Sequence, residues 1–198
     1  ISFPVPPEKS VRLGIGRSVK RDAVLVRIET ADGHVGWGEA HHGRAPGAIA
    51  RLIDSTLREL ILGRDATDVV GVWHQVYKMQ LASHGMGAAT ALALSGIDQA
   101  LWDIRCQLTG WPLYRLLGGA SRPVKAYAGG IALGYQEPAS LVEESRRYVT
   151  AGYRALKLGW NRFGHGELRD DVDQVVAARE RLGPDGILCI DAGTIWAE

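Results

Sequence analysis

Two charged side chains, Lys157 and Asp191, stand in apolar segments that look like short buried strands. Lys157 lies within Arg154-Ala-Leu-Lys157-Leu-Gly-Trp160, and Asp191 ends the segment Ile187-Leu-Cys-Ile-Asp191. A helical stretch separates the two segments, a pattern typical of a parallel α/β sheet. Enzymes built on such sheets place their functional groups at the carboxyl ends of the strands. The two residues therefore predict an α/β enzyme with its site at the strand ends.

Lys157 falls on one face of its strand. Alternation of side chains along a strand puts Lys157 opposite Leu156 and Leu158, which would pack under helices. The lysine then points toward the inside of the sheet or barrel, where an ammonium group needs either an anion beside it or a lowered pKa. The alternative is a lysine whose ammonium group reaches water from the strand end.

Asp191 shares a strand face with Ile187 and Cys189. A carboxylate at the carboxyl end of a parallel strand lies where catalytic and metal-binding groups lie in such folds. Mg²⁺ prefers carboxylate oxygens and usually takes few protein ligands. The alternative is a structural cap at a strand end or helix start, a common role for aspartate before Ala-Gly-Thr.

Three further polar residues, His41, His42 and Arg44, are candidate substrate-binding residues in a predicted loop between Glu39 and Pro46. Imidazole and guanidinium groups together could contact an anionic substrate. Adjacent residues on an extended loop point in opposite directions, so we do not expect the two imidazoles to bind one metal ion. The alternative is a solvated loop, although loops carry function disproportionately.

The elements that must position these residues fall into two groups. In the first group, an Asp32-Gly33 turn between strand-like segments 22–29 and 34–39 predicts a hairpin, and helical periodicity follows over 46–62, 65–81 and 88–108. In the second group, strands near 124–129, 154–160 and 187–191 alternate with helices near 138–150 and 166–182.

The fold class predicted from this order is an α+β domain followed by the first βα units of a parallel barrel or open sheet. We place the first domain at residues 1–119 and the second, incomplete, at 120–198, because Gly118-Gly119 and Pro123 mark a boundary. A (β/α)₈ barrel takes roughly 250 residues. We therefore expect the chain to be part of a longer protein.

Composition excludes several classes of protein. The formal net charge is +1, from 23 basic and 22 acidic residues, which argues against a nucleic-acid partner. No membrane partner is expected, since no apolar run is long enough to span a bilayer and no signal peptide is recognisable. Cys106 and Cys189 are expected to be buried free thiols in a cytoplasmic protein. The motifs of Rossmann, P-loop, zinc-finger and serine-hydrolase proteins do not occur.

Taken in order, five segments resemble the mandelate racemase/muconate lactonizing enzyme family of the enolase superfamily. They are Val35-Gly-Trp-Gly-Glu39-Ala, Ala93-Leu-Ser-Gly-Ile-Asp98-Gln-Ala-Leu-Trp-Asp103-Ile-Arg105, Pro112-Leu-Tyr-Arg-Leu-Leu-Gly-Gly119, Gly152-Tyr-Arg-Ala-Leu-Lys157-Leu and Ile190-Asp-Ala-Gly-Thr-Ile-Trp196.

This resemblance implies an α+β capping domain over a modified TIM barrel, with the active site between them. Asp191 resembles the first of three carboxylate ligands of an essential Mg²⁺, with the other ligands after residue 198. The metal would bind a substrate carboxylate and stabilise the enediolate formed when a base removes the α-proton. Lys157 matches the first lysine of the family's Lys-x-Lys strand, which contacts the substrate or tunes its neighbour. The resemblance puts His41, His42 and Arg44 in a segment that covers the substrate and sets specificity.

One departure shapes the functional hypothesis: Gly159 stands where the family has its second lysine. A glycine cannot transfer a proton, so we expect a one-base mechanism, with the base supplied from outside this chain. The leading hypothesis is a Mg²⁺-dependent lyase, a dehydratase of acid sugars or other hydroxy acids, which would take a small carboxylate substrate and form homo-oligomers. The alternatives are an isomerase of the same family (racemase, epimerase or cycloisomerase) and a binding or assembly protein without activity.

Overall fold

The computed structural model divides the chain into two compact units, each with its own hydrophobic core. It describes residues 1–10, 12–13, 16–130, 133–159 and 162–192. The first unit comprises Ile1–Phe3 and Lys20–Ser121, and the second comprises Pro4–Val19 and Arg122–Glu198. The domain boundary at residues 119 and 120 stays a prediction.

The first unit is built on the expected hairpin. Strands β5 (Val24–Glu29) and β6 (Val35–Ala40) pair antiparallel, from Val24 opposite Ala40 to Glu29 opposite Val35. Gly33 in the turn has a φ of 90°, a conformation that glycine adopts without steric cost. The hairpin predicted from Asp32-Gly33 is therefore confirmed.

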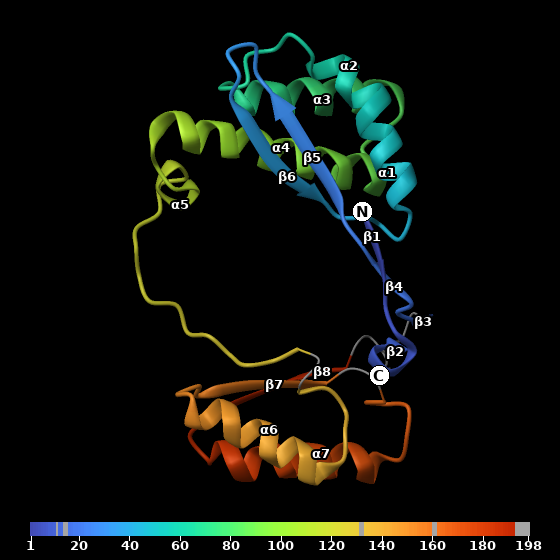
Figure 1. The fold of residues 1–198 in the computed structure, drawn as a ribbon, viewed down its shortest axis with the longest axis vertical. Helices are drawn as coiled ribbons and strands as arrows, with labels where there is room; N and C mark the ends of the chain where they lie inside the picture. Colours follow the sequence, from blue (N-terminus) through green and yellow to red (C-terminus); the bar gives the residue numbers. More distant parts are fainter. Residues whose placement is uncertain (11, 14–15, 131–132, 160–161, 193–198) are drawn as a thin grey trace. The chain divides into compact units, whose positions relative to one another are not determined.

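The first unit also contains helices. They are α1 (Pro46–Leu52), the π-helical turn η2 (Ile53–Leu57), α2 (Arg58–Ile61), α3 (Val69–Ser83), α4 (Ala88–Thr109) and α5 (Leu113–Leu116). Of these, α4 lies against both strands of the hairpin (Figure 1). No helix in the described ranges is long and apolar enough to cross a membrane.

The first predicted helix, over residues 46–62, is interrupted where one continuous helix was expected. The π-helical turn η2 lies inside it. The hydroxyl of Ser55 donates a 2.6 Å hydrogen bond to the carbonyl oxygen of Arg51, a contact of the kind that bends helices. The apolar stripe continues through this turn, so periodicity alone did not reveal it.

Helix α4 and strand β6 approach until their backbones touch. A Cβ atom on Gly38 would lie 2.1 Å from the carbonyl oxygen of Gly96, and a Cβ atom on Gly96 would lie 2.8 Å from the amide nitrogen of Ala40. Real Cβ atoms do not come this close to backbone atoms, so both glycines are required for the contact. This contact puts the core of the first unit between the hairpin and the helices.

Polar side chains of α4 bond the backbone of β6. The amide of Gln99 accepts from the N–H of Glu39 at 3.3 Å and donates to its carbonyl oxygen at 3.2 Å. The carboxylate of Asp103 accepts from the N–H of Trp37 at 2.9 Å, and the amide of Gln107 donates to the carbonyl oxygen of Val35 at 2.8 Å. Spaced four residues apart, these side chains share one helix face and bond alternate residues of the strand.

The second unit contains a parallel pair of strands, as the sequence predicts. Strands β7 (Ala155–Gly159) and β8 (Ile187–Asp191) run parallel, from Ala155 opposite Ile187 to Gly159 opposite Asp191. Helices α6 (Pro138–Thr150) and α7 (Leu168–Leu182) lie together on one side of the pair (Figure 1). Their core side chains, with those of the strands, include Leu141, Leu156, Leu158, Ala178 and Leu182.

The segment 124–129, predicted as a strand, forms only an isolated bridge. Ala128 pairs in parallel with Leu156: its N–H donates to the carbonyl oxygen of Ala155 at 2.9 Å, and its own carbonyl oxygen accepts from the N–H of Lys157 at 2.7 Å. Gly134 makes a second isolated bridge, to Gly159. The segment lies along β7, but a bridge at one residue does not make a strand, and residues 121–127 are exposed.

Residues 1–22 contain two pairs of short strands. Strand β1 (Ser2–Pro4) pairs with β4 (Lys20–Asp22), and β2 (Arg12–Leu13) pairs with β3 (Gly16–Arg17). A 3₁₀ turn, η1 (Pro7–Lys9), follows β1. These strands have two or three residues each, too short for alternation to be recognised in the sequence.

The contact between β6 and α4 predicts a large effect of a small substitution. We expect Gly38→Ala to lower the free energy of unfolding by about 1–3 kcal/mol, because overpacking a filled site forces the backbones apart. Urea denaturation of the full-length protein measures this change. The matched control is Gly47→Ala in α1, where a Cβ atom meets nothing within 4 Å. Equal stabilities of the two variants would contradict the packing argument.

Candidate functional site

Lys157, in the middle of β7, forms an ion pair with Asp191, the last residue of β8. The Nζ atom of Lys157 lies 3.1 Å from Oδ2 of Asp191, and the side chains are 26% and 32% exposed. Lys157 is opposite Cys189 in the register, so its side chain reaches along the sheet toward the residue at the end of β8. The ammonium group and the carboxylate therefore meet near the carboxyl end of the paired strands, although they lie far apart in the sequence.

The packing of β7 explains the direction of Lys157. Leu156 and Leu158 are fully buried, and they pack in one cluster with Leu141 of α6 and Leu182 of α7. Because successive side chains of a strand point to opposite faces, Lys157 lies on the face away from the helices. This is the face that alternation in the sequence predicts.

Tyr127 is a third member of this group, and the sequence analysis missed it. The Nζ atom of Lys157 lies 5.3 Å from the centroid of the Tyr127 ring, within the range of a cation–π contact. Tyr127 precedes Ala128, the residue that pairs with β7. The sequence did contain a signal for Tyr127: it is an aromatic residue in segment 124–129, which was predicted to be a strand of the same sheet as Lys157.

The pair keeps Lys157 positively charged. The hydrogen bond from Lys157 to Asp191 raises the pKa of Lys157 above its ordinary value, and Tyr127 raises it further. The sequence left open whether Lys157 has an anion beside it or a lowered pKa. In the structure it has an anion beside it, and its pKa is not lowered. Such a group can bind and neutralise negative charge at neutral pH, but it does not accept a proton.

Gly159 has a structural requirement of its own. Its φ is 139°, and a Cβ atom there would lie 1.9 Å from the carbonyl oxygen of Asp191. A second lysine at this position would force β7 and β8 apart. Glycine in place of the family's second lysine therefore affects the packing of the two strands as well as the catalytic chemistry.

The described residues fit one ligand of a magnesium site. Asp191 offers carboxylate oxygens at a strand end, the donor type that Mg²⁺ prefers. Within the described ranges, no group of three His, Cys, Asp or Glu side chains could hold a metal ion. Residues 193–196 of the predicted motif lie outside the described residues. The assignment of Asp191 as a metal ligand stays a prediction.

His41 and His42 lie in the first unit, directly after β6, and their rings stack. The ring centroids are 4.7 Å apart and the planes differ by 16°. The expectation that the two side chains point in opposite directions was wrong, because both rings fold back onto the backbone that follows them, where Gly43 and Arg44 have φ values of 54° and 63°. Among the described residues, Arg44 is the one non-glycine with a positive φ.

Both histidine rings are held by the backbone that follows them. Nδ1 of His41 accepts from the N–H of Gly43 at 3.0 Å, and Nδ1 of His42 accepts from the N–H of Arg44 at 2.9 Å. With Nδ1 as acceptor, each neutral ring carries its proton on Nε2. These residues belong to the first unit, while Lys157 and Asp191 belong to the second. Their contact with a substrate stays a prediction.

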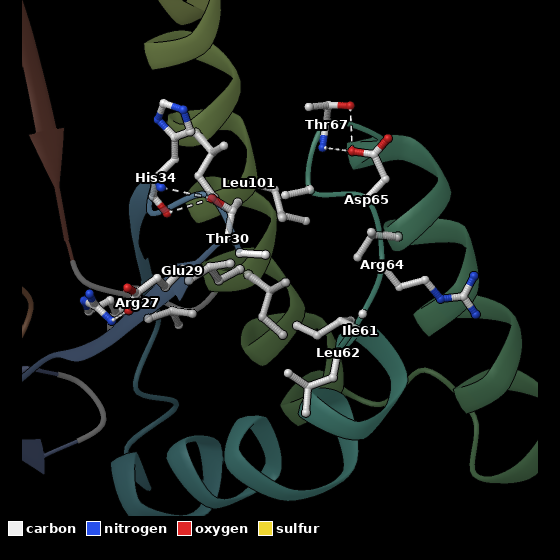
Figure 2. A pocket seen from close by; sticks show the side chains of 18 of the residues that line it. Arg27, Glu29, Thr30, His34, Ile61, Leu62, Arg64, Asp65, Thr67 and Leu101 are labelled. Carbon is white, nitrogen blue, oxygen red and sulfur yellow. Dashed lines mark hydrogen bonds and ion pairs between the residues drawn. The ribbon is translucent and has the colours of Figure 1, made fainter.

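The first unit also contains a cavity of about 670 Å³, which the histidine loop does not line. Figure 2 shows it between Thr30 and His34 at the hairpin turn on one side and Ile61 to Thr67 on the other. The loop of His41 begins at the opposite end of the hairpin, after Ala40. Of the charged side chains at the cavity, Arg27 pairs with Glu29 at 2.7 Å and Asp65 accepts from Thr67. None of the predicted site residues lines this cavity.

The ion pair predicts a measurable titration. In metal-free protein we expect Asp191→Asn to lower the pKa of Lys157 toward its ordinary value, because the hydrogen bond to Asp191 is the largest cause of the increase. Carbon-13 NMR of reductively methylated lysines measures the pKa, and loss of the signal in Lys157→Arg assigns it. Glu143→Gln on α6 is the control. An unchanged pKa in Asp191→Asn would show that the pair does not form in solution.

Gly159 gives a second prediction. Gly159→Ala should destabilise the protein more than Gly152→Ala, because both positions have a positive φ but only the first also lacks space for a Cβ atom. A non-glycine residue at a positive φ costs of order 1 kcal/mol or more by itself. Urea denaturation of both variants compares them. Equal losses would mean that β7 and β8 can separate without cost.

Comparison with known proteins covers nearly all of this chain. It is 36% identical over 184 residues to a 3,6-anhydro-alpha-L-galactonate cycloisomerase of Streptomyces coelicolor, a match of 91% of this chain and 49% of the relative. It is 33% identical over 176 residues to an arabinonate dehydratase of Saccharolobus solfataricus, covering 88% of this chain and 46% of the relative. The chain therefore spans about half the length of these curated relatives.

Solved structures share the fold. A member of the enolase superfamily from Polaromonas sp. JS666 is 48% identical with a TM-score of 0.87, over 100% of this chain and 50% of that one. A racemase from Streptomyces coelicolor with bound magnesium is 34% identical with a TM-score of 0.82, over 99% of this chain and 54% of that one. The expected fold class, an α+β capping domain followed by the first βα units of a modified TIM barrel, is confirmed.

One family model matches residues 2–118, more than half of the chain. It describes the N-terminal domain of mandelate racemase / muconate lactonizing enzyme. With the relatives and structures above, this match shows that the chain belongs to the mandelate racemase/muconate lactonizing enzyme family of the enolase superfamily.

Proposed function

We propose that this chain is part of a Mg²⁺-dependent enzyme that removes the proton next to the carboxylate of a small hydroxy acid and then eliminates water. The observation that carries this proposal is the pair of Lys157 and Asp191 at adjacent strand ends in a chain of this family. The arabinonate dehydratase relative supports dehydration of an acid sugar as the reaction.

Each site residue has a role that follows from its chemistry. Lys157 is a fixed positive charge beside Asp191, so it can bind the substrate carboxylate and the negative charge that develops when the α-proton leaves. Asp191 would hold Mg²⁺ together with ligands from outside the described residues. Bound Mg²⁺ would neutralise charge on the substrate carboxylate.

The reaction needs a base that these residues do not provide. Gly159 occupies the position of the family's second lysine, and Lys157 is hydrogen-bonded to Asp191. A base elsewhere in the full-length protein would take the α-proton, and the C–H electrons would form the double bond. The β-hydroxyl would leave as water on receiving a proton from the protonated base or from a second acid group. The resulting enol becomes a 2-keto-3-deoxy acid.

The loop of His41, His42 and Arg44 would contact the hydroxyl groups of the substrate. Nε2 of each neutral imidazole is an N–H donor, and the guanidinium group of Arg44 is a donor for anions. The backbone hydrogen bonds to Nδ1 orient both rings before a substrate arrives. Action in the cytoplasm and assembly into a homo-oligomer stay predictions.

Ring isomerisation is a second candidate function, since the cycloisomerase relative is 36% identical to this chain. It shares the first step, removal of a proton next to a carboxylate. The two reactions differ in their products, because isomerisation releases no water. The mass of the product therefore decides between them, because it equals that of the substrate after isomerisation and is lower by one water after dehydration.

Full-length protein with Mg²⁺ and a panel of aldonic acids and 3,6-anhydro-galactonates tests the proposal. We expect EDTA-sensitive formation of a 2-keto-3-deoxy acid, followed with semicarbazide. Lys157→Met and Asp191→Asn should each lower kcat/KM by about 10²-fold or more, as for loss of a group that stabilises developing charge. Lys78→Met, an exposed lysine of α3, should leave it unchanged. Conversion of an anhydro acid without water loss would favour the cycloisomerase, and no EDTA-sensitive turnover would exclude both reactions.

A further inference from the structure

Helix α7 holds the loops at the carboxyl side of the strands through two buried polar side chains. The described parts of these loops are residues 133–137, before α6, and 162–167, between β7 and α7. Asp171 and Gln174 are 5% and 1% exposed, and their spacing of three residues puts them on one face of α7. Neither residue was singled out by the sequence analysis.

Gln174 pairs with the backbone of the first loop. Its Nε2 donates to the carbonyl oxygen of Gln136 at 2.6 Å, and its Oε1 accepts from the N–H of Gln136 at 3.4 Å. A side-chain amide thus bonds both backbone groups of one residue, as a neighbouring strand would. A residue that cannot both donate and accept would lose at least one of these two hydrogen bonds in this part-buried place.

Asp171 bonds the second loop. Its Oδ2 accepts from the N–H of Gly164 at 2.9 Å. Its other oxygen, Oδ1, is buried and makes no hydrogen bond to any described residue. A buried carboxylate that accepts from a backbone N–H ties that part of the loop to the helix.

The two loops also contact each other. Phe163, which is fully buried, meets the ring of Tyr135 edge to face at 5.7 Å, and the guanidinium group of Arg162 lies 5.3 Å from the same ring. Gly134, in the first loop, pairs with Gly159, the residue opposite Asp191 in β8. The contacts of α7 therefore extend through both loops to the strand ends where Lys157 and Asp191 lie.

We propose that Asp171 and Gln174 are positioning residues that fix these two loops against the ends of β7 and β8 and so hold the substrate in line with Lys157 and Asp191. This rests on the proposed function, in which the substrate carboxylate binds at the strand ends. Neither residue touches the substrate. Each acts through the backbone that it holds, at Gly164 or at Gln136.

Hydrogen exchange tests the hold on the loops without any substrate. In the full-length protein, Asp171→Leu should speed exchange of the Gly164 amide, and Gln174→Met that of the Gln136 amide, by tenfold or more, since each substitution removes a side-chain acceptor of that N–H. Asp171→Asn keeps an acceptor oxygen and should retain protection at Gly164. Asp173→Leu replaces an exposed carboxylate of the same helix and is the matched control.

Kinetics of the same variants test positioning. We expect Asp171→Leu and Gln174→Met to lower kcat/KM by about 10²-fold, mostly in kcat, as for a misplacement of about 1 Å in a bound substrate. Asp171→Asn should restore activity. Assays run below the unfolding transition of every variant, so a loss of global stability alone would not change kcat.

Two results would overturn the proposal. Unchanged exchange at Gly164 and Gln136 would show that the side chains do not hold the loops, and faster exchange with wild-type kcat would show that the hold is only structural. Failure of the proposed function would look different: wild-type protein would turn over no acid sugar. The exchange data would then still decide whether α7 holds the loops.

Discussion

The register between β7 and β8 is the constraint on which the candidate site depends. Gly159 lies opposite Asp191, and the space between them admits no Cβ atom. A slip of one residue would turn Lys157 toward the helices and bring a leucine to the other face, because side chains alternate along a strand. The glycine thus fixes the distance between the strands, and the register fixes which charge meets which. The ammonium group is tolerated in this half-buried place because it contacts a carboxylate and an aromatic ring.

A close backbone contact has the same effect in the first unit. Gly38 and Gly96 let β6 and α4 touch, and Gln99, Asp103 and Gln107 then reach the backbone of the strand. A strand edge covered in this way is closed to pairing with another chain. The loop of His41 starts at the residue after β6, so the direction in which it leaves the hairpin depends on this helix. Segments that the family resemblance singled out, Val35–Ala40 and Ala93–Arg105, are the two sides of this contact.

Sequence patterns predicted the features that one element decides by itself. Turn residues gave the hairpin, and apolar periodicity gave α3, α4, α6, α7, β7 and β8 with small differences at their ends. Features that depend on neighbouring elements were missed. Tyr127 matters only because Ala128 pairs with β7, and the stacking of His41 on His42 depends on backbone turns at Gly43 and Arg44 that no periodicity encodes. Asp171 and Gln174 read as ordinary surface positions of a helix until loops that are distant in sequence pack over them.

The first half of α7 carries buried polar side chains and the second half carries apolar ones, and this difference follows from the topology of a parallel sheet. A helix that follows a strand begins at the carboxyl end of that strand, so the first half of α7 faces loops and the second half faces the sheet. Ala178 and Leu182, in the second half, pack with Leu156 and Leu158, which need only apolar contact. Asp171 and Gln174, in the first half, meet backbone N–H and C=O groups, which must be bonded when buried. Buried polar residues near the start of such a helix therefore mark the end of the sheet where loops are held in place, which is also the end where α/β enzymes bind their substrates.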